Sequence, residues 1–391
     1  MSEENPFHYL ENLSGIEVDP TLSITPETNV TDYFARKLVF DKPPLSVRDE
    51  VTNDSIVDEW EQSESCQGLR EEPGAEFDLE LNEECEQENY QPIIGILTQP
   101  VPEAKKDQFN YEDYILEIND NFIKWGGSRT VAVPYNISEE NLLKLLPQIN
   151  GMLFTGGALN LINNSTLEPH PYYVTAKRIF EYSKFMKDVK EEEWPILGVC
   201  QGLELISIIL GGDKPSTLDY IDIYGKSLPI EWKVQNVSEE SKLFETFPDY
   251  LVEAMENEGL ALHAHTYSIS LDTYNETPGL KEFMKITQTD TWIRNYDGKE
   301  VEFIASMEAK DYPIFTTMYH PEYQMLDYLG PVRWTSGETE LIQEIAFRIS
   351  LAVNRHARMN SNRVSPQNEV FFNKLMSINR MPPQPYPMLE L

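Results

Sequence analysis

The chain has 391 residues and a formal net charge of −35, from 31 basic and 66 acidic side chains. A chain of this length can bury a substantial core, as one large domain or two average ones. The negative charge repels nucleic-acid phosphates and no basic stripe offsets it, which argues against a nucleic-acid partner. No stretch reaches the ~18 continuous apolar residues that a membrane span needs.

The negative charge is concentrated near the N-terminus. Residues 1–90 hold 24 acidic and 5 basic side chains and show no sustained helical or strand period. We interpret them as an acidic extension, either a disordered tail or an arm that docks onto a protein partner. The first residues lack the basic and apolar regions of a signal peptide, so we expect a cytoplasmic location. A lysosomal or secreted location is the alternative if the natural N-terminus carries a signal.

Residues 91–358 have the pattern of a folded domain. Strands alternate there with amphipathic segments of ten or more residues, which predicts an α/β fold with a mostly parallel central sheet flanked by helices. Such sheets bind ligands at the carboxyl ends of their strands. The strands are predicted at 92–98, 130–135, 151–154 and 194–199. The helices are predicted at 109–125, with a stop at Gly126-Gly127, at 138–149, with a serine cap at Ser138, and at 171–189.

The second half of this domain contains antiparallel signals. Alternating segments surround an Asp297-Gly298 turn, which predicts a hairpin. A closing helix is predicted over 336–358, starting at a serine, and the proline-containing residues 359–391 form a C-terminal tail or docking strip.

A cysteine stands where a buried strand turns into a helix. The run Gly198-Val-Cys200-Gln-Gly202 is the pattern of a nucleophile elbow, in which glycines allow the close packing of strand and helix. The helix that begins at Gln201 should lower the pKa of the cysteine through its N-terminal dipole. The alternative is a buried core thiol. Neither Cys66 nor Cys85 forms a metal-binding spacing with it, so we expect no metal and no cofactor.

A general base and an oxyanion hole are also predicted. His320 follows an apolar strand and Glu322 lies two residues on, so the pair can act as base and orienter for Cys200, although a lone histidine is more often structural. Gly157, at the end of the strand 151–154, can offer a backbone N–H to an oxyanion, with the N–H of Gln201 as the second donor. The alternative is a simple tight turn at the glycines.

The motifs GVCQGLEL, FTGG, HAHTYSIS and MYHPE, in this order, resemble those of the gamma-glutamyl hydrolases in the class I glutamine amidotransferase-like superfamily. The resemblance runs from about residue 91 to 356. It implies a cysteine hydrolase that cleaves γ-glutamyl bonds, with folylpoly-γ-glutamates as the family substrate. It assigns Cys200 as nucleophile, His320 as base and Glu322 as its partner.

The resemblance also suggests substrate-binding residues. His265 matches the histidine of an Asn-aromatic-His motif, although His263 stands where the family has the asparagine. Glu204 is expected in the same pocket, where it can meet the substrate's α-amino group, and Gly156 lines it. The alternatives without a role in substrate binding are a strand with one polar face at His265 and an exposed helix residue at Glu204.

Several departures from the family motifs keep a second hypothesis open. Thr155, Val199 and Tyr319 replace the usual Pro, Thr and Trp of three motifs. The domain can instead be a retired or moonlighting hydrolase that serves as a structural subunit of a large assembly, for example a cytoskeletal or ciliary one, through its N-terminal arm. A glutaminase acting in trans with a synthase is a third hypothesis. The sequence is compatible with a homodimer but does not predict one.

Overall fold

A computed structural model describes residues 92–108, 112–324, 339–365 and 380–381. The acidic extension, with Cys66 and Cys85, lies outside the described residues, as does most of the C-terminal tail. The predicted boundaries of these two segments therefore stay predictions.

The core of the fold is an eight-stranded sheet with the order β4-β1-β5-β6-β12-β11-β10-β8. Its first five strands run parallel to one another, which confirms the predicted mostly parallel sheet. Strands β1, β5, β6 and β12 are buried at every position, as expected for strands covered on both faces. The parallel strands are β1 (Ile93–Leu97), β4 (Arg129–Val133), β5 (Gly151–Phe154), β6 (Ile196–Val199) and β12 (Ile314–Thr317).

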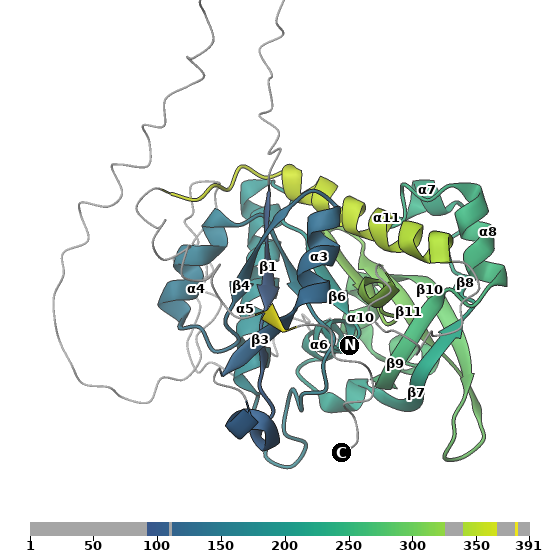
Figure 1. The fold of residues 1–391 in the computed structure, drawn as a ribbon. Helices are drawn as coiled ribbons and strands as arrows, with labels where there is room; N and C mark the ends of the chain where they lie inside the picture. The colour runs from purple at the N-terminus through teal and green to yellow at the C-terminus, as the bar shows by residue number, and fades with distance from the viewer. Residues whose placement is uncertain (1–91, 109–111, 325–338, 366–379, 382–391) are drawn as a thin grey trace, which may run out of the picture. The chain divides into compact units, whose positions relative to one another are not determined.

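Helices cover both faces of this sheet (Figure 1). Helices α3 and α11 pack against each other, and α5 packs against α6. Crossover connections in parallel sheets are right-handed, and this places the two pairs on opposite faces. Ser138 caps α4 through a hydrogen bond from the Asn141 N–H, as predicted. The helices are α3 (Glu117–Trp125), α4 (Glu139–Leu145), α5 (Pro171–Lys190), α6 (Gln201–Leu210) and α11 (Thr339–Arg358).

The predicted helix over 109–125 is correct only in its second half. Residues Asp113–Leu116 form strand β3, which pairs with the short strand β2 (Gln99–Pro100), and residues 109–111 lie outside the described part. Tyr114, Ile115 and Leu116 favour a strand, and pairing with β2 overrides their helical spacing. The helix ends at Gly126 and Gly127, as predicted, and Gly127 has a φ of 101° that favours glycine.

The rest of the large sheet is antiparallel. β10 (Met284–Ile293) and β11 (Glu300–Ala309) pair as the predicted hairpin, and Gly298 in the turn has a φ of 66°. β8 (Glu231–Trp232) forms the edge. β7 (Asp219–Leu228) and β9 (Ala261–Ser268) form a separate two-stranded sheet. The predicted serine start of α11 lies outside the described residues, and the helix is described from Thr339.

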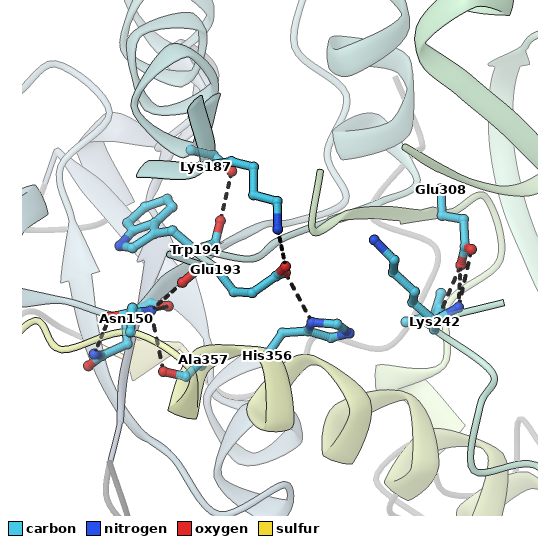
Figure 2. Close-up of polar contacts among 11 residues, drawn as sticks. Asn150, Lys187, Glu193, Trp194, Lys242, Glu308, His356 and Ala357 are labelled. Atoms are coloured by element: carbon cyan, nitrogen blue, oxygen red, sulfur yellow. Dashed lines mark hydrogen bonds and ion pairs between the residues drawn. The ribbon is translucent and has the colours of Figure 1, made fainter. Parts of the chain in front are cut away.

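Two carboxylates, the half-buried Glu193 and the buried Glu308, hold these elements together at a distance from the carboxyl ends of the strands. Figure 2 shows Glu193 between Lys187 on α5 and His356 on α11, at 2.8 and 3.2 Å. Figure 2 also shows Glu308 on β11, which accepts hydrogen bonds from the Lys242 N–H and from other groups of the loop before α8 (Asp249–Asn257). Glu193 therefore ties the closing helix to the body of the domain.

The bridge at Glu193 makes the stability of the domain depend on pH. Burial alone would raise the pKa of Glu193, but hydrogen bonds from His356 and Lys187 outweigh it and lower the pKa to about 2. The stability from this depressed pKa is fully present above the unfolded value near 4.5 and is lost as the pH falls toward 2, up to about 3 kcal/mol.

We expect Glu193→Gln to lower the free energy of unfolding at pH 7 by about 1–3 kcal/mol. The difference in the free energy of unfolding between the variant and wild type should narrow as the pH falls below 4.5, because the wild-type carboxylate then loses its charge. Urea unfolding between pH 7 and 3 measures this, with the exposed Glu256→Gln as the control. A gap that is absent at pH 7, or that does not change with pH, would contradict the prediction.

Candidate active site

Cys200 lies on the sharp turn between β6 and α6. Its φ is 52°, a left-handed value that non-glycine residues rarely adopt and that marks local strain. The turn requires glycine on both sides: a Cβ on Gly198 would lie 2.8 Å from the backbone of Gly202, and one on Gly202 would collide with the Phe154 carbonyl. The strand-turn-helix geometry predicted for this segment is therefore present.

The order of the strands brings a histidine to this cysteine. β12 lies next to β6, so His320, three residues beyond β12, reaches the same sheet edge as Cys200. His320 Nδ1 lies 2.8 Å from Glu322 Oε1, and the His320 ring lies near enough to Cys200 to act on the pKa of its thiol. All three side chains are buried. The structure thus places the predicted nucleophile, base and orienter in one chain of contacts.

The electrostatics of Cys200 differ from the expectation. Burial raises the pKa of the thiol, Glu204 and Glu322 add to the rise, and His320 opposes it without reversing it. The prediction that the start of α6 lowers this pKa is wrong for the unliganded site, because loss of solvent around the sulfur outweighs the favourable neighbours. The Cys200 side chain is accordingly a protonated thiol at neutral pH.

The glycine pair after β5 lines the other side of the cysteine. A Cβ on Gly156 would lie 2.6 Å from His320 Cε1 and 3.5 Å from Cys200 Cβ, so the Gly156 backbone lies against both side chains. Gly157 is exposed. Gln201 is the first residue of α6, so its N–H is one of those that the helix itself leaves unbonded. The two predicted oxyanion donors therefore lie on segments that border the thiol.

Gln99 is a further residue of this site, and the sequence analysis missed it. Its Nε2 lies 3.3 Å from both Thr155 Oγ1 and the Gly156 carbonyl oxygen. A Cβ on Gly157 would lie 2.7 Å from the same nitrogen. Gln99 therefore holds the glycine turn in place. Its position just after β1 was the available signal, because β1 and β5 are neighbours and end at one sheet edge.

Glu204 lies in the first turn of α6, and its N–H donates to the Cys200 carbonyl oxygen at 3.1 Å. Burial raises the pKa of its carboxyl group to about 8, although the nearby His320 lowers it. Glu204 is therefore a neutral acid at pH 7, within electrostatic reach of His320.

Strand β9 borders the site and carries His265. The Ala264 carbonyl oxygen lies 4.0 Å from Cys200 Sγ. The Leu262 carbonyl oxygen accepts a hydrogen bond from the backbone N–H of His320 at 2.9 Å. His265 is buried, and its Nε2 lies 3.1 Å from His263 Nδ1. Burial, His263 and His320 hold the pKa of His265 well below its usual range, so this ring is neutral.

Across the described ranges, no group of three or more His, Cys, Asp or Glu side chains is arranged to hold a metal ion. In those same ranges no helix is both long enough and apolar enough to cross a membrane.

The chain matches one family of known proteins. The model of the Peptidase C26 family matches residues 92–322. Mouse gamma-glutamyl hydrolase is 31% identical over 232 residues, which cover 59% of this chain and 67% of the mouse protein. Gamma-glutamyl hydrolase B of Dictyostelium discoideum is 29% identical over 60% of this chain and 63% of its own length. Gamma-glutamyl hydrolase 1 of Arabidopsis thaliana is 29% identical over 61% and 65%. The match thus spans less than two thirds of the Dictyostelium and Arabidopsis relatives.

Replacement of Gly156 should disturb the pair of Cys200 and His320. We expect Gly156→Ala to displace the His320 ring, because the added Cβ would lie 2.6 Å from Cε1. Loss of the His320 contact removes the interaction that lowers the pKa of Cys200, so the thiol should react with iodoacetamide only at higher pH than in wild type. The rate of alkylation against pH measures this, with the exposed Asn160→Ala in the same loop as control. An unchanged profile would show that the ring does not depend on the glycine.

Glu204 should destabilise the domain at alkaline pH. Its folded pKa of about 8 lies above the unfolded value near 4.5, so the folded state retains a proton that the unfolded chain releases between these pH values. Stability is therefore lost as the pH rises from 4.5 to 8. We expect Glu204→Gln to be more stable than wild type at pH 8.5, by a few kcal/mol (order of magnitude), and equal to it near pH 4.5. Melting temperature against pH tests this, and a Gln variant less stable than wild type at pH 8.5 would refute it.

Proposed function

Because the chain belongs to the Peptidase C26 family, we propose that it hydrolyses γ-glutamyl amide bonds with Cys200 as the nucleophile. The observation that carries the proposal is the strained turn at Cys200 beside His320, whose Nδ1 lies 2.8 Å from Glu322 Oε1. A buried core thiol would need neither the strained backbone nor a buried His-Glu pair beside it.

In the first half of the reaction His320 takes the proton of the Cys200 thiol. The thiolate attacks the γ-carbonyl carbon, and the N–H groups of Gly157 and Gln201 donate to the oxyanion that forms. Glu322 accepts the Nδ1–H of His320 at 2.8 Å and stabilises the imidazolium. A hydrogen bond of this kind keeps the proton-accepting nitrogen of His320 turned toward the sulfur.

In the second half the imidazolium gives its proton to the leaving amine. The C–N bond breaks and a thioester remains on Cys200. A water molecule then loses a proton to His320 and attacks the thioester carbon, and the proton returns to the sulfur as the glutamyl acid leaves. The enzyme ends in its starting state, with the proton back on the Cys200 sulfur.

Folylpoly-γ-glutamates are the substrate that we propose, from the motifs shared with the gamma-glutamyl hydrolases. Glu204 is suited to the α-amino nitrogen of the γ-linked glutamyl unit, which in a folylpoly-γ-glutamate is an amide N–H that can donate to the buried carboxyl group. Gly156 lines the pocket, and His265 borders it from β9. A protein partner for residues 1–90 and a cytoplasmic location remain predictions, and a homodimer remains compatible with the sequence.

The test is glutamate release from a γ-linked glutamyl oligomer by the full chain. We expect release by wild type and a loss of about 10³-fold or more in Cys200→Ala and His320→Gln, because each removes a member of the triad. The matched control is the double variant Cys66→Ala, Cys85→Ala, which keeps Cys200 and should retain full activity. A wild-type chain that releases no glutamate and whose Cys200 resists alkylation at pH 8 would instead favour the structural-subunit hypothesis.

A further inference from the structure

A line of three buried polar side chains runs from β9 to the large sheet, and the mechanism above uses only its first member. His265 Nε2 lies 3.1 Å from His263 Nδ1, and His263 Nε2 lies 3.1 Å from Asp290 Oδ2. Asp290 Oδ1 accepts the Thr291 N–H at 2.7 Å. β9 pairs with β7 and not with β10, so this line of side chains links two sheets.

The surroundings of this line are apolar. The His263 ring lies edge-on to Phe303 at 5.3 Å and to Tyr319 at 6.1 Å, and the His265 ring packs on Phe303 at 5.5 Å. Buried polar groups need partners, because an unpaired one costs about 1–3 kcal/mol. The two imidazole rings in this apolar layer therefore depend on the hydrogen bonds that link them to each other and to Asp290.

The acid end of the line decides where the protons lie. An ionised carboxylate only accepts hydrogen bonds, so a singly protonated imidazole bound to one must carry its proton on the nitrogen that faces it, which here is His263 Nε2. His263 Nδ1 is then a bare acceptor, and His265 must place its own proton on Nε2 to donate to it. Which nitrogen of a histidine carries the proton is set by the hydrogen bond of the other.

We propose that Asp290 and His263 are positioning residues that fix His265 in the Nε2–H tautomer, with Nδ1 as an acceptor beside the active site. The contacts that carry this inference are the two 3.1 Å hydrogen bonds and the burial of all three groups. The backbone of Tyr267 lies near the same ring, but it makes no hydrogen bond of normal geometry with Nδ1. Nδ1 is thus a buried acceptor to which an N–H group of the substrate can donate.

His265 is close enough to the reacting groups for its tautomer to matter. Its neighbour Ala264 places a carbonyl oxygen 4.0 Å from Cys200 Sγ, and His320 acts electrostatically on the His265 ring. A bare Nδ1 attracts a substrate N–H, whereas a protonated Nδ1 repels it. Asp290, which lies on another sheet, would thereby control substrate binding or orientation through two imidazoles.

The first arm of the test is spectroscopic and needs no substrate. The ring ¹⁵N shifts of His265 in the full chain report its tautomer at pH 8, and the chain has only six histidines, so His265→Gln identifies the resonance. We expect wild type to show the proton on Nε2. Asp290→Asn should shift the proton of His265 toward Nδ1. The asparagine N–H₂ can donate to His263 Nε2, which reverses the direction of both hydrogen bonds between these three side chains. Asp311→Asn, an exposed carboxylate, is the matched control and should leave the tautomer unchanged.

The second arm is kinetic and rests on the proposed function. We expect Asp290→Asn to lower kcat/KM for a γ-linked glutamyl oligomer by about 10- to 100-fold, the range typical for partners that orient a functional histidine. Asp311→Asn should match wild type. A wild-type chain without activity but with the Nε2–H tautomer would sustain the positioning role and refute the function.

Two results would overturn the inference. One is a wild-type His265 with its proton on Nδ1, a measurement that requires no variant and so stays decisive if Asp290→Asn fails to fold. The other is a folded Asp290→Asn chain whose His265 tautomer and kcat/KM both equal those of wild type.

Discussion

The close contact between β6 and α6 is the constraint on which the candidate site depends. Gly198 and Gly202 let the two elements approach until a single residue, Cys200, must make the whole turn between them. The strain at that residue is a local cost that the packed sheet and helix sustain. Everything else in the site is arranged around the fixed position of one sulfur: His320 from the next strand, and the Gly156 turn from the strand on the other side.

Burial gives this site its chemistry as well as its shape. The same loss of solvent raises the pKa of Cys200 and of Glu204, and it forces His263, His265 and Asp290 to bond with one another. A closed, low-dielectric site strengthens each remaining electrostatic interaction, so a substrate group can shift these protonation states when it binds. The resting site is therefore largely uncharged at Cys200 and Glu204, and ionisation would accompany binding and proton transfer.

The sequence predicted the features that depend on local pattern. Strand and helix alternation, the Gly126-Gly127 stop, the hairpin at Gly298 and the turn at Cys200 all follow from residues close together in the chain. It failed where distant segments decide the outcome. Residues 113–116 form strand β3 because they pair with β2, and Gln99 contacts the site because β1 and β5 are neighbours. The pKa of Cys200 is raised because the folded chain excludes solvent from the thiol.

The strand order has a consequence for how the domain is made. β12 lies in the interior of the sheet between β6 and β11, although it is the last strand of that sheet to be synthesised. A ribosome therefore releases β6 and Cys200 well before their neighbour on one side exists, and an unpaired central strand is prone to aggregate. Sequence-distant pairing of this kind also slows folding. Cys200 thus gains its neighbour His320 only in the final stage of folding, after the chain from β12 to α11 has emerged.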